Sequence, residues 1–202
     1  MFDRRSLLRT GSAATLGAIA LTAVAGGTDL ATAAANNPDL LGDPSQDPSE
    51  QYPFPKRLTH QERLHLKRFD ELDFVVYSGQ QWSRLGESHS DTIRVHWPDG
   101  HYTDGIDRHI EDLKAQFVWA PDTRISQHPI RIAKDNLTAV TGVSRGTFSR
   151  PMPDGQGGFI QPTGQKFAIN MVTVGLWNKR GVMDEEFLFW DAQTFMQQIG
   201  VG

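Results

Sequence analysis

The stretch QKFAINMVTVGLWNKRGVMDEEFLFWD, residues 165–191, decides the class of fold. It reads as two β-strands, about 165–178 and 182–191, joined by a turn at Asn178-Lys179-Arg180-Gly181. The first strand is apolar at both alternating sets of positions, which is typical of a strand covered on both faces. We expect helices of the chain to cover one face and a second copy of the protein, in a homodimer, to cover the other.

The residues before this stretch continue the β pattern. Two further strands are expected at about 124–133 and 137–148, with a hairpin turn at Asp135-Asn136. Residues 149–163 carry three prolines and three glycines, which indicates a long hairpin loop. The segment 124–191 therefore predicts a meander of four antiparallel strands.

Helical patterns flank the meander. Thr59 and Glu62 have the spacing of a capping box, and apolar residues at helical intervals predict a helix over about 60–78. A short helix around Trp82, a strand over 91–97 and a helix capped by Thr103 or Asp104 follow, and a closing helix runs over 192–199. This order predicts an α+β fold with helices on one side of a curved sheet.

The N-terminus predicts export. Arg4 and Arg5 precede an uncharged run from Gly11 to Gly27, and small residues follow at 31–35. These are the parts of a twin-arginine signal peptide over residues 1–35, so we expect a periplasmic or extracellular protein that uses the twin-arginine export machinery. The alternative, an uncleaved membrane anchor, is disfavoured because a spanning helix needs about 20 apolar residues. A Pro-rich linker is expected over 36–57 and one folded domain over 58–202.

Composition excludes two classes of function. The chain has 24 acidic and 20 basic residues and no basic run, so nucleic acid is not an expected partner. It has no cysteine, which excludes disulfide bonds and thiolate chemistry.

Several segments resemble a known family over about residues 60–202. They are His89-Ser90-Asp91, His96-Trp97-Pro98-Asp99-Gly100, Thr103-Asp104-Gly105, Gly146-Thr147-Phe148, and the run from Glu185 to Asp191 that leads into Met196-Gln197-Gln198-Ile199-Gly200. With the order of elements, they resemble the nuclear transport factor 2-like superfamily and its SnoaL-like branch of polyketide and ester cyclases. The resemblance implies a cone-shaped α+β barrel, also called cystatin-like, with a curved mixed or antiparallel sheet.

The resemblance also implies a catalytic carboxylate. Asp191 ends the last strand, where relatives hold an aspartate that moves a proton at a carbon next to a carbonyl group, and Glu185 shares its strand parity. A carboxylate in an apolar pocket suits this role, because burial raises its pKa toward neutrality. Two other interpretations stay open: Asp191 as the N-cap of the closing helix, and Glu185 in a solvated turn.

Histidines supply a second set of candidates. Five of the seven lie between positions 89 and 128, and His96 and His128 are the ones for which we predict a catalytic role in the pocket. No HxH or HExxH spacing occurs, so we expect no metal site and no cofactor. Relatives can pair the aspartate with a histidine on a later strand. This chain has none after His128, so His96, Glu185 or Asn170 would take that role.

The predicted pocket is mostly apolar, and its expected ligand is a small hydrophobic or aromatic carbonyl compound. Three functions remain open: an acid/base enzyme of the cyclase, isomerase, dehydratase or hydrolase type, a non-catalytic binding protein, and an assembly protein that acts through its dimer surface. The residues expected to line the pocket are Trp82, Trp97, Trp119, Asn170, Met171, Phe187 and Phe189.

Overall fold

The computed structural model describes residues 52–202. The predicted signal peptide, residues 1–35, and residues 36–51 of the predicted linker lie outside the described residues. Within 52–202, none of the helices combines the length and the apolar character that crossing a membrane requires.

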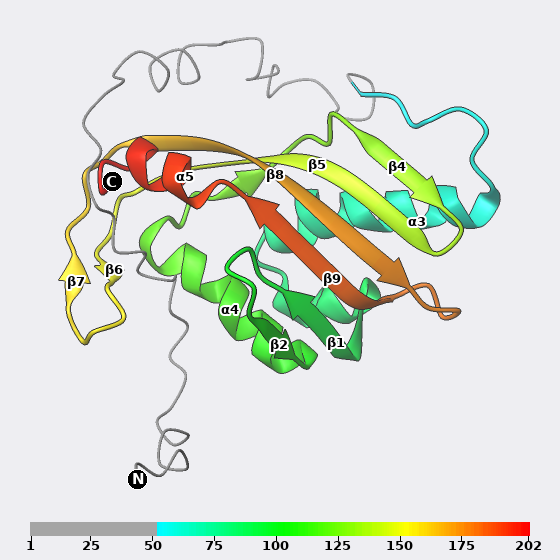
Figure 1. The fold of residues 1–202 in the computed structure, drawn as a ribbon, viewed down its shortest axis with the longest axis horizontal. Coiled ribbons are helices and arrows are strands. Elements are labelled where there is room, and N and C mark those ends of the chain that lie inside the picture. Colours follow the sequence, from blue (N-terminus) through cyan, green and yellow to red (C-terminus); the bar gives the residue numbers. More distant parts are fainter. Residues whose placement is uncertain (1–51) are drawn as a thin grey trace, which may run out of the picture.

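A curved, mixed sheet forms the frame of the domain (Figure 1). Its order is β2-β1-β9-β8-β5-β3, and β4 also pairs with β5. The pairing of β1 with β9 is parallel and the other pairings are antiparallel, which confirms the predicted mixed sheet. The strands are β1 (His89–His96), β2 (Tyr102–Asp104), β3 (Arg124–Ile125), β4 (Arg131–Lys134), β5 (Leu137–Thr147), β8 (Lys166–Trp177) and β9 (Met183–Trp190).

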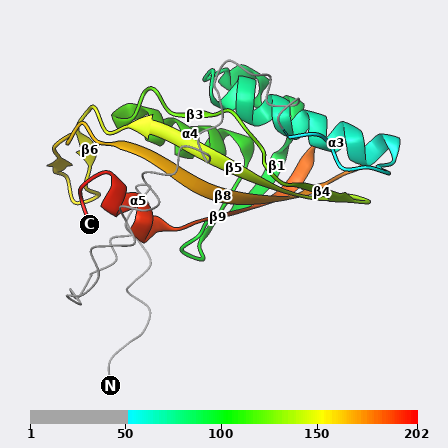
Figure 2. The same cartoon turned by 90° about the horizontal axis from the view of Figure 1, so that it is seen from above.

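Helices α3 and α4 lie on the same side of the sheet (Figure 2). The predicted capping box at the start of α3 is confirmed: Thr59 Oγ1 accepts a hydrogen bond from the Glu62 amide at 3.2 Å, and Glu62 accepts one from the Thr59 amide at 2.8 Å. The helical segments are α3 (His60–Glu71), its π-helical continuation η2 (Leu72–Tyr77), the 3₁₀ turn η3 (Trp82–Glu87), α4 (Ile106–Trp119) and α5 (Ala192–Gln198).

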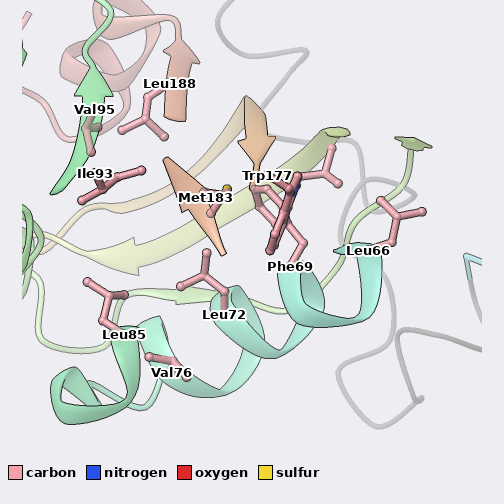
Figure 3. Packing of buried hydrophobic residues seen from close by; sticks show 11 residues of the cluster. Leu66, Phe69, Leu72, Val76, Leu85, Ile93, Val95, Trp177, Met183 and Leu188 are labelled. Carbon is pink, nitrogen blue, oxygen red and sulfur yellow. The ribbon is translucent and has the colours of Figure 1, made fainter. Parts of the chain in front are cut away.

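The main core lies between α3, η2 and the sheet (Figure 3). Phe69 and Leu72 pack against Trp177 and Met183, and each fully buried side chain of this size contributes about 1.5–3 kcal/mol. Gly175 is required in the middle of β8, because a Cβ atom there would lie 2.4 Å from the Met183 sulfur. A second cluster around Trp119, Phe148 and Phe167 includes Phe195 from α5.

Two local predictions were wrong, and a third was incomplete. The strand expected over 124–133 is two strands, β3 and β4. The seven residues from Ile125 to Arg131 face only the five residues of β5 from Val140 to Ser144, so the segment between β3 and β4 leaves the sheet. Helix α4 begins after Gly105, whose φ is +92°, and no side chain caps it. Thr103 and Asp104 do not serve as caps because they lie on β2, where Asp104 forms an ion pair with Arg94. The loop 149–163 contains a small hairpin of β6 (Met152–Pro153) and β7 (Phe159–Ile160).

Strand β8 presents two different faces. Phe167, Ile169 and Thr173 are buried on the side of the helices. On the opposite side, which we call the outer face, Val172 is exposed and its cross-strand neighbour Phe189 is 51 % exposed. Among the described residues, the chain thus covers one face of β8 and leaves much of the other open.

Candidate functional site

Strand β9 determines which carboxylate enters the interior. Glu186 and Leu188 are buried and face the helices, whereas Glu185, Phe187 and Phe189 alternate with them on the outer face. Glu186 pairs across to Val95 on β1 and Gly175 on β8, so it sits in the middle of the sheet and not at an edge.

Two histidines from other elements meet Glu186. His89 begins β1 and His109 lies on the inner side of α4. The Nε2 atoms of His89 and His109 lie 3.6 Å and 3.4 Å from Glu186 Oε2, and all three side chains are almost completely buried. We call these three residues the central cluster.

Burial sets the protonation of the central cluster. It lowers the pKa of His109 to about 4, more than the Glu186 charge raises it, so this imidazole is neutral at neutral pH. For Glu186, burial works to raise the pKa, but the neighbouring His89 and His109 outweigh it, and the pKa lies below its ordinary value. The cluster therefore carries an ionised carboxylate beside a neutral imidazole.

A second buried network surrounds His128, which sequence patterns had already selected. Its Nδ1 lies 2.7 Å from Asp70 Oδ1, and its Nε2 lies 2.8 Å from Asp73 Oδ2. Arg131 holds the other side of Asp70 with two hydrogen bonds, at 3.0 Å and 3.1 Å. Asp70 is on α3 and Asp73 on η2, so their three-residue spacing places both carboxylates on one side of the helical segment. We call these four residues the Asp–His–Asp network.

The two carboxylates of this network have different surroundings. Burial raises the pKa of Asp73, hydrogen bonding to His128 lowers it, and the negative charge of Glu186 adds to the increase. Burial lowers the pKa of His128, but the two aspartates outweigh it, and the pKa lies above its ordinary value. The effect of Glu186 on Asp73 shows that the network and the central cluster are electrostatically coupled.

The structure does not bring the four residues expected to be catalytic into one site. Only His128 lies in the interior. Asp191 is an exposed N-cap of α5: its carboxylate accepts hydrogen bonds from the Thr194 amide at 3.0 Å and the Thr194 hydroxyl at 2.7 Å, and these bonds lower its pKa. Glu185 lies on the outer face, 3.1 Å from His96.

The residues expected to line one pocket are also dispersed. Phe187 stacks on His96, and Phe189 and Asn170 are exposed on the outer face. Trp119 is part of the second core cluster, and Trp82 packs against Tyr77 and Phe117. Trp97 comes near the central cluster, with its ring 6.2 Å from that of His109. The half-buried Met171 lies on β8 beside Gly142.

Sequence reasoning missed most of the buried charged residues. The histidine concentration did include His89 and His109, and the parity of Glu186 with Leu188 and Trp190 was visible. The signal for Asp73 was weaker: it is a carboxylate within the apolar run LDFVVY, residues 72–77. In the structure this run is π-helical, a local geometry that is frequent at functional sites.

Comparison by sequence identifies no relative: no family model and no curated protein matches the chain. Solved structures do match. A candidate SnoaL-like polyketide cyclase from a Jannaschia species aligns with a TM-score of 0.64 and 16 % identity, over 73 % of this chain and 99 % of that one. The candidate polyketide cyclase IdmH from Streptomyces antibioticus aligns with a TM-score of 0.58 and 20 % identity, over 70 % of this chain and 100 % of that one. A nuclear transport factor 2-like protein of unknown function from Burkholderia pseudomallei aligns with a TM-score of 0.54 and 13 % identity, over 70 % of this chain and 99 % of that one.

The chain has the SnoaL-like, nuclear transport factor 2-like fold. The fold class expected from the sequence is therefore confirmed, including the curved mixed sheet with helices packed on it. At these identities the likeness concerns the backbone, so the chemistry of this chain has to be argued from its own interior residues.

Proposed function

We propose that this protein is an exported acid/base enzyme that moves protons on a small, partly apolar carbonyl compound, in a cyclisation, isomerisation, dehydration or hydrolysis. The observation that carries the proposal is the pair of the partly buried Asp73 and the fully buried His128, whose facing atoms lie 2.8 Å apart. The SnoaL-like fold adds support, because candidate polyketide cyclases share it.

Asp73 is the group we assign to proton transfer. Its pKa is raised by burial, which brings the carboxylate closer to the pH at which it can both take up and release a proton. His128 acts as the positioning residue, because its imidazole holds the Asp73 carboxylate and is itself fixed from the other side by Asp70. Arg131 balances the charge of Asp70, so that His128 keeps its orientation.

A surface hollow offers an approach for the ligand. It has a volume of about 550 Å³, within the usual range of small-molecule sites, and it reaches Asp70 and Phe74, both of which contact His128. Phe54, Phe74 and Val75 give it apolar walls. The cationic side chains of Arg63 and Lys67 border it as well, which suits a flat, apolar compound with electron-rich oxygen atoms.

The test measures proton exchange, because this readout does not depend on the final product. Native mass spectrometry of the exported protein first identifies a retained ligand class, and compounds of that class are then incubated with the protein in deuterated buffer. We expect deuterium to appear at the carbon next to the carbonyl group, and Asp73→Asn to reduce this rate by 10²–10⁴-fold.

Asp191→Asn is the matched control, because it removes the other carboxylate that the sequence favoured. Under the proposal this variant keeps exchange near the wild-type rate, since Asp191 caps a helix at the surface. Loss of exchange in Asp191→Asn but not in Asp73→Asn would transfer the catalytic role to Asp191. Ligand retention without exchange in the wild-type protein would identify a non-catalytic binding protein.

We also propose that the protein forms a homodimer through the outer face. Rows of apolar side chains run across the strands there: Ile132, Ala139, Val174 and Phe187 are consecutive cross-strand neighbours. Ile132 is 56 % exposed, and an apolar face of this kind favours burial against a second copy.

A further inference from the structure

We infer that His89, His109 and Glu186, the central cluster, bind one divalent transition-metal ion, and that zinc is the ion their geometry fits best. The inference is independent of the proposed function, because the Asp–His–Asp network supplies the proton-transfer groups without it. Two imidazoles and one carboxylate are a common ligand set for zinc in proteins.

The spacing of the ligand atoms supports the assignment. In a tetrahedral zinc site with bonds of about 2.1 Å, neighbouring ligand atoms lie about 3.4 Å apart. The two imidazole nitrogens lie 3.4 Å and 3.6 Å from Glu186 Oε2, and the ligand atoms of all three residues fall within 4.8 Å of one another. An octahedral ion with the same bond length would require about 3.0 Å between neighbours. Two of the three edges of this cluster therefore already have the length of a zinc tetrahedron's edge, and the third is at most 4.8 Å.

Unpaired polar atoms give a second, independent reason. His89 Nε2 and Glu186 Oε2 are buried and have no hydrogen-bond partner, although buried polar atoms in proteins are normally paired. The two atoms face each other at 3.6 Å. One ion between them would satisfy both at once, whereas a hydrogen bond at 3.6 Å would be too long to do so.

His89 is held in the form that binds metal. Its Nδ1 lies 2.9 Å from Ser88 Oγ and 3.4 Å from the Leu85 carbonyl oxygen. A carbonyl oxygen only accepts, so these contacts favour the proton on Nδ1 and leave the Nε2 lone pair directed at Glu186.

The chemistry of the ligands agrees with this assignment, because zinc binds imidazole in its neutral form and a carboxyl group in its ionised form. A carboxylate in a buried position needs a positive partner, which a bound metal ion would supply.

A route to the cluster begins at the surface. Ser88, the hydrogen-bond partner of His89, lines a hollow of about 350 Å³ between η2, η3 and the turn that joins β8 to β9. Gly86 and Val182 border the same hollow. An ion that enters there would reach the neighbour of His89 in the chain, and a water molecule would complete its coordination.

The experiment measures metal content and metal binding in the exported protein. Protein purified without chelators is analysed by elemental mass spectrometry, then stripped with a chelator and titrated with ZnCl₂ and CoCl₂. We expect about one zinc per chain, and in the cobalt form the intense visible absorption of a four-coordinate ion. Glu186→Gln, His89→Gln and His109→Gln should each weaken zinc binding at least tenfold, because each removes one ligand.

His96→Gln is the matched control. His96 and Glu185 also form an imidazole–carboxylate pair, at 3.1 Å, but on the outer face. This variant should bind zinc like the wild type. Circular dichroism of each metal-free variant separates a lost ligand from a lost fold, and the conservative Glu186→Gln change gives a second measurement if a histidine variant unfolds. Metal content well below one per chain with no tight zinc binding, or binding that is lost in His96→Gln and kept in Glu186→Gln, overturns the inference.

Discussion

Replacing His109 by glutamine should flatten the pH dependence of stability between pH 7 and pH 5. His109 is almost completely buried on α4, and burial lowers its pKa to about 4. In the unfolded chain its pKa returns to about 6.5. Between these two values the unfolded state binds a proton that the native state does not, so the free energy of unfolding decreases as the pH falls.

The two pKa values fix the size of the effect. Their difference corresponds to about 3 kcal/mol in total, and about 2 kcal/mol of this is lost between pH 7 and pH 5. The wild-type protein should lose this contribution, and His109→Gln should not. The measurement is urea denaturation of chelator-treated protein at pH 7.0, 6.0 and 5.0, with the midpoint and slope compared at each pH.

Other titrating groups explain why the variant is needed. The pKa of His128 is raised, so its contribution is complete below about pH 6.5 and is lost as the pH rises, which is the opposite sign. The pKa of Glu186 is lowered, so its contribution is lost only as the pH falls below about 4.5. The His128 contribution is common to the two proteins and cancels in the difference. Removal of His109 also removes one of the groups that lower the Glu186 pKa, which further reduces the loss of stability at low pH in the variant. Parallel curves for wild type and His109→Gln would refute the assignment of a buried, neutral His109.

Three further predictions concern the core, the surface carboxylate and the outer face. Phe69→Ala should lower the free energy of unfolding by about 3–5 kcal/mol, because Phe69 is fully buried between α3 and the sheet; a loss below 1 kcal/mol in urea denaturation would contradict this packing. Asp191→Ala should cost about 1 kcal/mol through loss of the α5 cap to Thr194, and an unchanged midpoint would show that the cap does not contribute. Val174→Lys together with Phe189→Lys should convert the proposed dimer to a monomer in light scattering, and a dimer of unchanged affinity would exclude the outer face as the interface.

The order of elements was predictable from the sequence, because it depends on local patterns. The capping box at Thr59 and the turns near Asp135 and Gly181 use residue types that few other conformations accept, and they appear in the structure where the sequence places them. The break between β3 and β4 was not predictable, because it depends on the pairing with β5: Ile125 faces Ser144 and Arg131 faces Val140, in different registers.

The interior site could not be predicted from local sequence patterns, because its residues are far apart in the chain. His128 was selected from the sequence, but its partners Asp70 and Asp73 are 58 and 55 residues away, and no spacing rule connects them. The same holds for the central cluster, in which β1, α4 and β9 each contribute one side chain.

The sequence by itself determined the α+β class, the capping box of α3, most of the turns and the alternation along β9. Only the tertiary structure decided which face of β9 turns inward. The outward set holds Glu185, Phe187 and Phe189, and the inward set holds Glu186, Leu188 and Trp190, so each face offers a carboxylate among apolar residues and the pattern favours neither. Because β9 lies between β1 and β8 with α3 and α4 over one side, Glu186 is buried next to His89 and His109, while Glu185 remains at the surface.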